Sequence, residues 1–154
     1  MTMRLITKQI LLECAITKKY KAEDLSVEIN SNIDKLVILS NNLQTLYGNE
    51  LKFSCTLRDK EHNSKIPNAA PFSSHSLGIC ADIIDIGQPF AFWLSQKPRQ
   101  FYIDNNFCIE HPAYTPKHVH IQIGYKHSSN QLWFKPSKTA IPISKNFNCN
   151  FQPL

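Results

Sequence analysis

The sequence has no apolar run long enough to cross a membrane. Charged residues and prolines such as Lys8, Asp82 and Pro89 interrupt each long apolar stretch, whereas a transmembrane helix needs about 20 apolar residues in succession. The N-terminus also lacks the pattern of a signal peptide, because Lys8 breaks the apolar run 5–12 and no small-residue cleavage site follows it. We therefore expect synthesis in the cytoplasm without this kind of export signal.

The cysteines form no CxxC pair. Their number, five, is odd, and they are widely spaced along the chain: Cys14, Cys55, Cys80, Cys108 and Cys149. A disulfide framework or a cysteine-based zinc knuckle needs paired, closely spaced cysteines. We expect most of them to be reduced and to serve as small residues of the core.

The sequence also lacks a concentrated basic stripe. The 17 Lys and Arg residues exceed the 12 Asp and Glu residues and give a net charge of +5, but only Lys18–Lys21 forms a local cluster. Strand-binding proteins combine such a stripe with interleaved aromatic residues. We therefore expect no nucleic-acid partner. A mild positive charge instead favours approach to an anionic bacterial wall.

The composition is that of an ordinary globular domain, with 42% hydrophobic and 19% charged residues in 154. The 3.6-residue apolar period is clearest over 24–47, where Gly48 supplies a stop signal. Alternating apolar and polar residues over 51–57 predict a half-buried strand. The sequence predicts one α+β domain with a core over 5–136 and a tail over 137–154. Helices are predicted over 7–17, 24–47 and 89–100, a loop over 58–72, and strands over 51–57, 78–86, 101–109, 119–125 and 132–135.

Three residues have the types and spacing of a metal site. His75 precedes Gly78 by three residues and Asp82 by seven, so a sharp turn at the glycine brings the imidazole and the carboxylate to one ion. Farther along the chain, His118 and His120 are two apart on a predicted strand and share a face. Ligation by His75, Asp82 and His120 leaves a fourth zinc position for water, as catalytic sites do.

The segment from Ser73 to Asp82 resembles the SxHxxGxAxD signature of the D-alanyl-D-alanine carboxypeptidase and L-alanyl-D-glutamate endopeptidase family. That family shares its fold and zinc site with lysostaphin-type peptidases and the Hedgehog signalling domain. Cys80 stands where alanine is usual. The segment 119–122 resembles the second metal motif, in which the second histidine of His-x-His binds zinc. The resemblance covers about residues 5–136 and implies a small antiparallel sheet with flanking helices.

The same resemblance suggests catalytic roles. Many members carry a carboxylate base three residues before the last metal histidine, where this chain has Lys117. Glu110 is the best substitute, because the small phage-encoded members also carry an acidic residue there; Asp85 and Asp104 are weaker candidates. His118 either stabilises the oxyanion, orients the base or lines the cleft. Arg58 resembles the arginine that contacts the substrate carbonyl or carboxylate, and Ser73 is expected to orient His75.

These expectations define a zinc-dependent peptidoglycan peptidase, phage- or prophage-encoded, that cleaves stem-peptide amide bonds involving D-amino acids. Carboxypeptidase and endopeptidase activities both fit. We expect a monomer that acts on the bacterial cell wall, with peptidoglycan peptides or virion components as partners and no membrane association. One rival is a zinc-bound, non-catalytic binding or virion module of the same fold; a basic nucleic-acid-binding protein is another. A cysteine or serine hydrolase is disfavoured, because no such residue lies in a nucleophile elbow.

Overall fold

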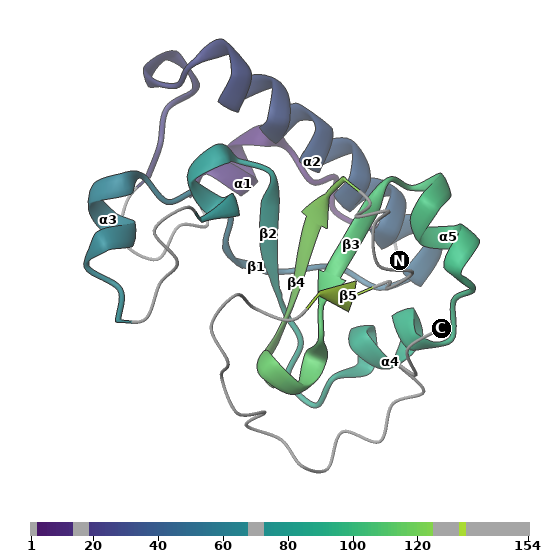
Figure 1. Cartoon of the computed structure of the whole chain (residues 1–154). Coiled ribbons are helices and arrows are strands. Elements are labelled where there is room, and N and C mark those ends of the chain that lie inside the picture. The colour runs from purple at the N-terminus through teal and green to yellow at the C-terminus, as the bar shows by residue number, and fades with distance from the viewer. Residues whose placement is uncertain (1–2, 14–18, 68–72, 125–132, 135–154) are drawn as a thin grey trace. The chain divides into compact units, whose positions relative to one another are not determined.

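The computed structural model describes residues 3–13, 19–67, 73–124 and 133–134 (Figure 1). Contacts along the chain divide it into two compact units, Met1–Ile83 and Ile84–Leu154. The structure is a mixture of helices and short, mainly antiparallel strands, so the α+β class is confirmed, whereas its relation to the peptidase fold stays a prediction. Within the described residues, no helix is both long and apolar enough to span a membrane.

The first unit is built on the long helix α2 (Val27–Tyr47), which ends at Gly48 as predicted but begins three residues after the predicted start at residue 24. The Ser26 hydroxyl accepts a hydrogen bond from the Ile29 N–H, and Gly48 ends the helix with a φ of 77°. Its inward face is apolar and fully or nearly fully buried: Ile33, Leu36, Leu39 and Leu43. Burying each of these side chains stabilises the fold by about 1.5–3 kcal/mol.

The N-terminal segment is fastened to α2 by side-chain amides as well as by apolar contacts. The short helix α1 (Lys8–Glu13) packs against α2 through the buried Leu11 and Leu12. Asn41 bonds to both the N–H and the carbonyl of Ile6. The buried Gln44 donates to the Arg4 carbonyl and accepts from the Leu51 N–H. These hydrogen bonds all involve the C-terminal half of α2.

The first unit also contains two paired strands. Strand β1 (Phe53–Cys55) pairs antiparallel with β2 (Cys80–Ile84), with Cys55 opposite Asp82. The register shifts between Phe53 and Cys55, as at a β-bulge, which re-aims side chains locally. Between the strands lie a short helix, α3 (Lys60–Ser64), and the 3₁₀ turn η2 (Ser74–Leu77); a further 3₁₀ turn, η1 (Ala22–Asp24), precedes α2.

The second unit holds helices α4 (Pro89–Ser95) and α5 (Arg99–Asp104), strands β3 (Phe107–Glu110), β4 (His118–Ile123) and β5 (Trp133–Phe134), and the 3₁₀ turn η3 (Pro112–Tyr114). Strand β3 pairs antiparallel with β4 and parallel with β5. Helix α5 packs against β3, and the Tyr102 and Phe107 rings stack at 4.9 Å between centroids. The stacked rings form the aromatic centre of this unit.

Three predictions of local structure were wrong. The segment 58–72 is not entirely loop, because Asp59 caps α3 by accepting a hydrogen bond from the His62 N–H. The helix predicted over 89–100, with its end near Pro98, is two helices, because Pro98 is the N-cap of α5 and proline has no N–H with which to continue the preceding helix. Residues Arg99–Asp104 are therefore helical, and the strand predicted from residue 101 begins only at Phe107.

Candidate metal centre

His75 is buried in the first unit with its two ring nitrogens in different surroundings. It belongs to the turn η2, and 3% of its surface is exposed. Its Nδ1 atom lies 2.8 Å from the carbonyl oxygen of Thr56. A carbonyl oxygen only accepts, so in the neutral ring Nδ1 carries the hydrogen and Nε2 has the lone pair. Metal-binding histidines usually have this arrangement, in which a backbone carbonyl or carboxylate fixes the ring and its tautomer.

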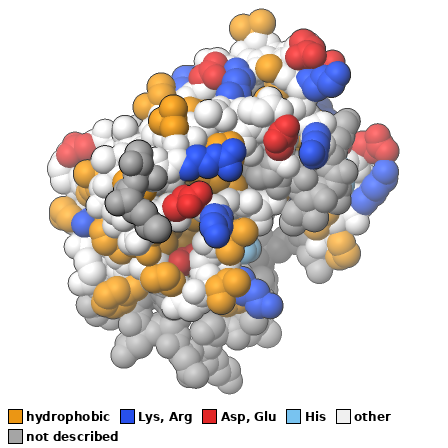
Figure 2. Space-filling model, turned by 180° about the vertical axis from the view of Figure 1, so that it is seen from behind, with side chains coloured by type: hydrophobic (Ala, Val, Ile, Leu, Met, Phe, Trp, Pro, Cys, Tyr) orange, Lys and Arg blue, Asp and Glu red, His pale blue; other side chains and the backbone are white. Residues whose placement is uncertain are grey.

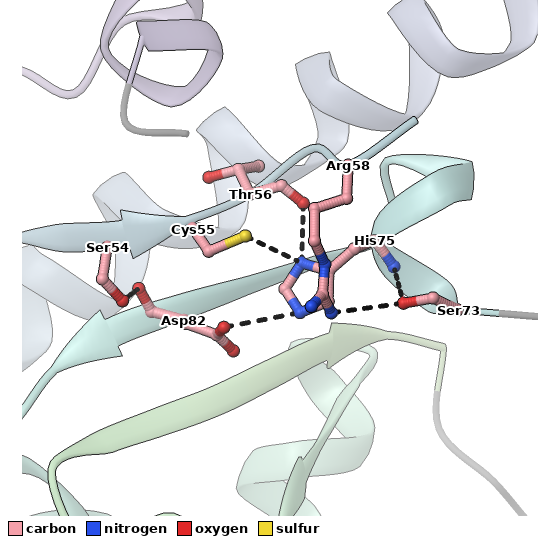
Figure 3. Close-up of polar contacts among 7 residues, drawn as sticks. All are labelled: Ser54, Cys55, Thr56, Arg58, Ser73, His75 and Asp82. Atoms are coloured by element: carbon pink, nitrogen blue, oxygen red, sulfur yellow. Dashed lines mark hydrogen bonds and ion pairs between the residues drawn. The ribbon is translucent and has the colours of Figure 1, made fainter. Parts of the chain in front are cut away.

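Asp82 faces the Nε2 atom of His75 from strand β2. Its Oδ2 atom lies 3.4 Å from that nitrogen, and its side chain is 16% exposed (Figure 3). This distance is longer than the 2.7–3.2 Å of a good hydrogen bond. It matches the separation of about 3.3 Å between a nitrogen and an oxygen ligand on a tetrahedral zinc ion. The residues present therefore fit a divalent metal ion at this point.

Two buried thiols also lie beside His75. Cys55 Sγ is 3.7 Å from His75 Nδ1, and Cys55, His75 and Asp82 each offer a ligand atom within 4.8 Å of the other two. The ligand atoms of Cys80 and His75 are likewise within 4.8 Å. The three cysteines in the described residues (Cys55, Cys80 and Cys108) are buried and outside any disulfide, as expected. Sequence reasoning assigned no site role to Cys55, because its proximity to Asp82 depends on strand pairing.

These neighbours change the protonation of His75. Burial is the largest single influence and lowers its pKa, but the negative charge of Cys80 and hydrogen bonds with Asp82, Cys55 and Cys80 together raise the pKa well above the ordinary value of 6.5. The cluster thus favours a cation at its centre, which is a proton in the metal-free protein. A divalent ion must displace that proton to bind.

The loop that carries His75 is anchored at several points. The Ser73 hydroxyl accepts hydrogen bonds from the His75 N–H and from Arg58 Nη2, at 3.3 and 3.4 Å (Figure 3). Gly78 adopts a φ of 66° directly against helix α2, and Asn32 of that helix donates to the Leu77 carbonyl at 2.9 Å. The expected roles of Ser73 in orienting His75 and of Gly78 in turning the chain agree with these contacts.

Arg58 lies next to His75 and has spare hydrogen-bonding capacity. Its backbone N–H donates to the His75 carbonyl at 3.3 Å, and its side chain reaches Ser73 as described. Its Nε atom is buried and has no hydrogen-bond partner among the described residues. A buried donor on a charged group is costly to leave unsatisfied.

The other predicted site residues lie in the second unit. His120 on β4 is 7% exposed and is among the residues able to hold a metal ion. His118 lies two residues earlier on β4, and residues two apart on a strand share a face; Val119 and Ile121, on the other face, are fully buried. Continuing the β3–β4 register from the pair Ile109–Ile121 by one step sets Glu110 opposite His120. Residues opposite each other in an antiparallel pair share a face.

The weaker candidates for a catalytic base have other partners. Asp85 is 3% exposed, and its carboxylate accepts hydrogen bonds from the Phe90 and Ala91 N–H groups at the start of α4. Asp104 accepts one from Gln100 at 2.7 Å. Lys117 contributes its backbone carbonyl, which accepts from the Asp85 N–H. Glu110 is the candidate that the β3–β4 register places opposite the predicted ligand His120.

A cavity of about 260 Å³ in the first unit is separate from this cluster. It is lined by the N-terminal segment, the end of α2 and the start of β1, including Ile6, Gln44, Leu51 and Phe53. None of its lining residues belongs to the cluster around His75.

The face of the protein in Figure 2 shows acidic and basic side chains interspersed among the described residues, so on that face they form no extended field of one sign.

Comparisons with known proteins add no family to these observations. No protein-family model matches the chain, and no curated protein and no solved structure matches it. The chemistry of the site is therefore argued from its own residues.

Proposed function

We propose that the protein is a zinc peptidase that hydrolyses stem-peptide bonds of peptidoglycan, with His75, Asp82 and His120 as metal ligands. The observation that carries this proposal is the pairing of His75 Nε2 with Asp82 Oδ2 at 3.4 Å while Thr56 occupies Nδ1. Both residues are the zinc-ligand types of the resembled signature and lie in its order. His120 completes the set through the His-x-His motif. When bound, zinc supplies Lewis-acid activation of water and of the scissile carbonyl.

The remaining roles follow from position and charge. Glu110 acts as the general base and passes the proton to the leaving amine; its register position opposite His120 supports this role. Arg58 binds a substrate carbonyl or carboxylate, for which a planar guanidinium is suited. His118, one strand period from His120, is proposed to donate a hydrogen bond to the developing oxyanion.

Hydrolysis of purified muropeptides tests this proposal. The wild-type protein, loaded with zinc, is expected to release stem-peptide fragments and to lose activity on chelation. In Glu110→Gln we expect at least about a 100-fold lower turnover with unchanged zinc content. Asp104→Asn is the matched control, because its carboxylate belongs to the same unit but bonds Gln100; it should retain activity.

One observation favours a second candidate, a zinc-bound module that binds wall peptides or virion components without cleaving them. Lys117 stands where the resembled peptidases carry their carboxylate, and a protonated lysine cannot accept a proton. Under this candidate the wild-type protein binds one zinc ion and muropeptides but releases no fragments. Cleavage by the wild type that Glu110→Gln abolishes excludes it.

A further inference from the structure

Cys55 is placed to act as a metal ligand in addition to the residues of the resembled signature. It is 8% exposed and ends strand β1. It pairs with Asp82 across the two strands, and paired residues of antiparallel strands project to the same face. The bulge at Phe53–Cys55 sets this register; bulges are frequent next to functional sites because they re-aim a side chain.

Cys55 lies close to both other proposed ligands of the first unit, His75 and Asp82. Its Sγ is 3.7 Å from the His75 ring at Nδ1, and the ligand atoms of Cys55, His75 and Asp82 lie within 4.8 Å of one another. The 3.7 Å contact is to the nitrogen bonded to the Thr56 carbonyl, whereas the proposed metal lies at Nε2, from which a sulfur ligand on a tetrahedral zinc ion is separated by about 3.6 Å. Coordination therefore requires the Cys55 side chain to turn from the Nδ1 edge of the ring toward Nε2 and Asp82, whose ligand atom lies within 4.8 Å of the sulfur.

Resting on the metal site proposed above, we infer that Cys55 binds the ion as a thiolate beside His75 and Asp82. A sulfur ligand selects zinc or another borderline ion over magnesium and calcium, which prefer oxygen. With His120 also bound, the thiolate fills the fourth position, which catalytic sites leave open for water. Cys55 thereby controls access to the metal, and cleavage of a stem peptide requires the thiolate to leave the ion.

This inference is tested by binding Co²⁺ to the metal-free protein, kept reduced with a reductant that contains no thiol, and recording the absorption spectrum. A thiolate on Co²⁺ gives a near-ultraviolet sulfur-to-cobalt band, whereas the visible d–d bands report binding by any ligands. The wild type is expected to show both. Cys55→Ala should lose the near-ultraviolet band, and Cys80→Ala should keep it. Cys80 is the matched control, since it is another buried thiol beside His75; circular dichroism verifies that each variant folds.

The outcomes separate this inference from the proposed function. Visible bands without the sulfur band in the wild type overturn the role of Cys55 and leave the metal site intact. Loss of the sulfur band in Cys80→Ala also overturns it, because Cys80 is then a ligand. Loss of all cobalt binding in folded Cys55→Ala, with binding kept in Cys80→Ala, supports Cys55. No cobalt binding by the wild type overturns the metal site itself.

Discussion

The Oδ2 atom of Asp82 lies 3.4 Å from the Nε2 atom of His75, the ring nitrogen that is not bonded to the Thr56 carbonyl. Each side chain is positioned by a separate element: His75 by the turn η2 and Asp82 by strand β2. His75 is buried and the Asp82 side chain is 16% exposed, so a cation between them, either the proton on His75 or a metal ion, offsets the cost of burying the carboxylate. This relationship gives the site its chemistry and leads to the following predictions.

Gly78→Ala is expected to destabilise the first unit by more than Gly48→Ala does. Both glycines have a left-handed φ, of 66° and 77°, but a Cβ on Gly78 would lie 3.2 Å from side-chain atoms of Ile29 and Ile33. Left-handed strain costs each variant about 1–2 kcal/mol, and crowding adds about 1–3 kcal/mol at Gly78 alone. Denaturant unfolding of both variants measures the difference. Equal losses of stability would contradict the close packing of this turn on α2.

Arg58→Lys is expected to lower kcat/KM for stem peptides by about 10–100-fold, since a hydrogen bond to a charged group is worth about 1.5–3 kcal/mol. Lysine keeps the charge but lacks the planar set of donors that includes Nε. Zinc content should not change, because Arg58 touches the metal site only through Ser73 and the His75 backbone. Steady-state kinetics with a parallel metal assay check both statements. Unaltered kinetics would remove Arg58 from substrate binding.

His111 is expected to make the protein less stable in mild acid. Its Nδ1 accepts a hydrogen bond from the Ala113 N–H at 3.1 Å, and burial lowers its pKa from 6.5, outweighing a backbone hydrogen bond that raises it. A group with a lowered folded pKa contributes stability that is present above the unfolded value and lost as the pH falls.

The variant His111→Asn isolates this effect, because asparagine also caps through its side-chain oxygen but does not titrate in this range. Unfolding midpoints of the two proteins should be similar at about pH 8, and the wild type should lose more stability on going to about pH 5. Identical pH dependence in the two proteins would show that His111 does not titrate on unfolding.

The helix α2 and the candidate ligands could be predicted because their signals are local in the sequence. The apolar period of α2 and its stop at Gly48 lie within one segment, and the spacing from Ser73 to Asp82 is likewise short. Alternation on β4 set the faces of His118 and His120 for the same reason.

The rest depends on contacts between residues far apart in the chain. The backbone carbonyl that fixes the His75 ring comes from Thr56, 19 residues earlier, and no pattern of side chains in the sequence predicts this contact. Cys55 reaches the site only through the shifted register of β1 on β2, and Glu110 meets His120 only through the pairing of β3 with β4. The short helices α3 and α5 were missed because they contain too few residues to show a period.

Metal content of the purified protein is the most direct test of the central claim. After reconstitution with zinc under reducing conditions and removal of excess metal, elemental analysis should find one zinc ion per chain in the wild type. Asp82→Asn should hold none, whereas His62→Asn, a histidine on α3 outside the cluster, should keep it. A folded wild-type protein that retains no zinc would contradict the account.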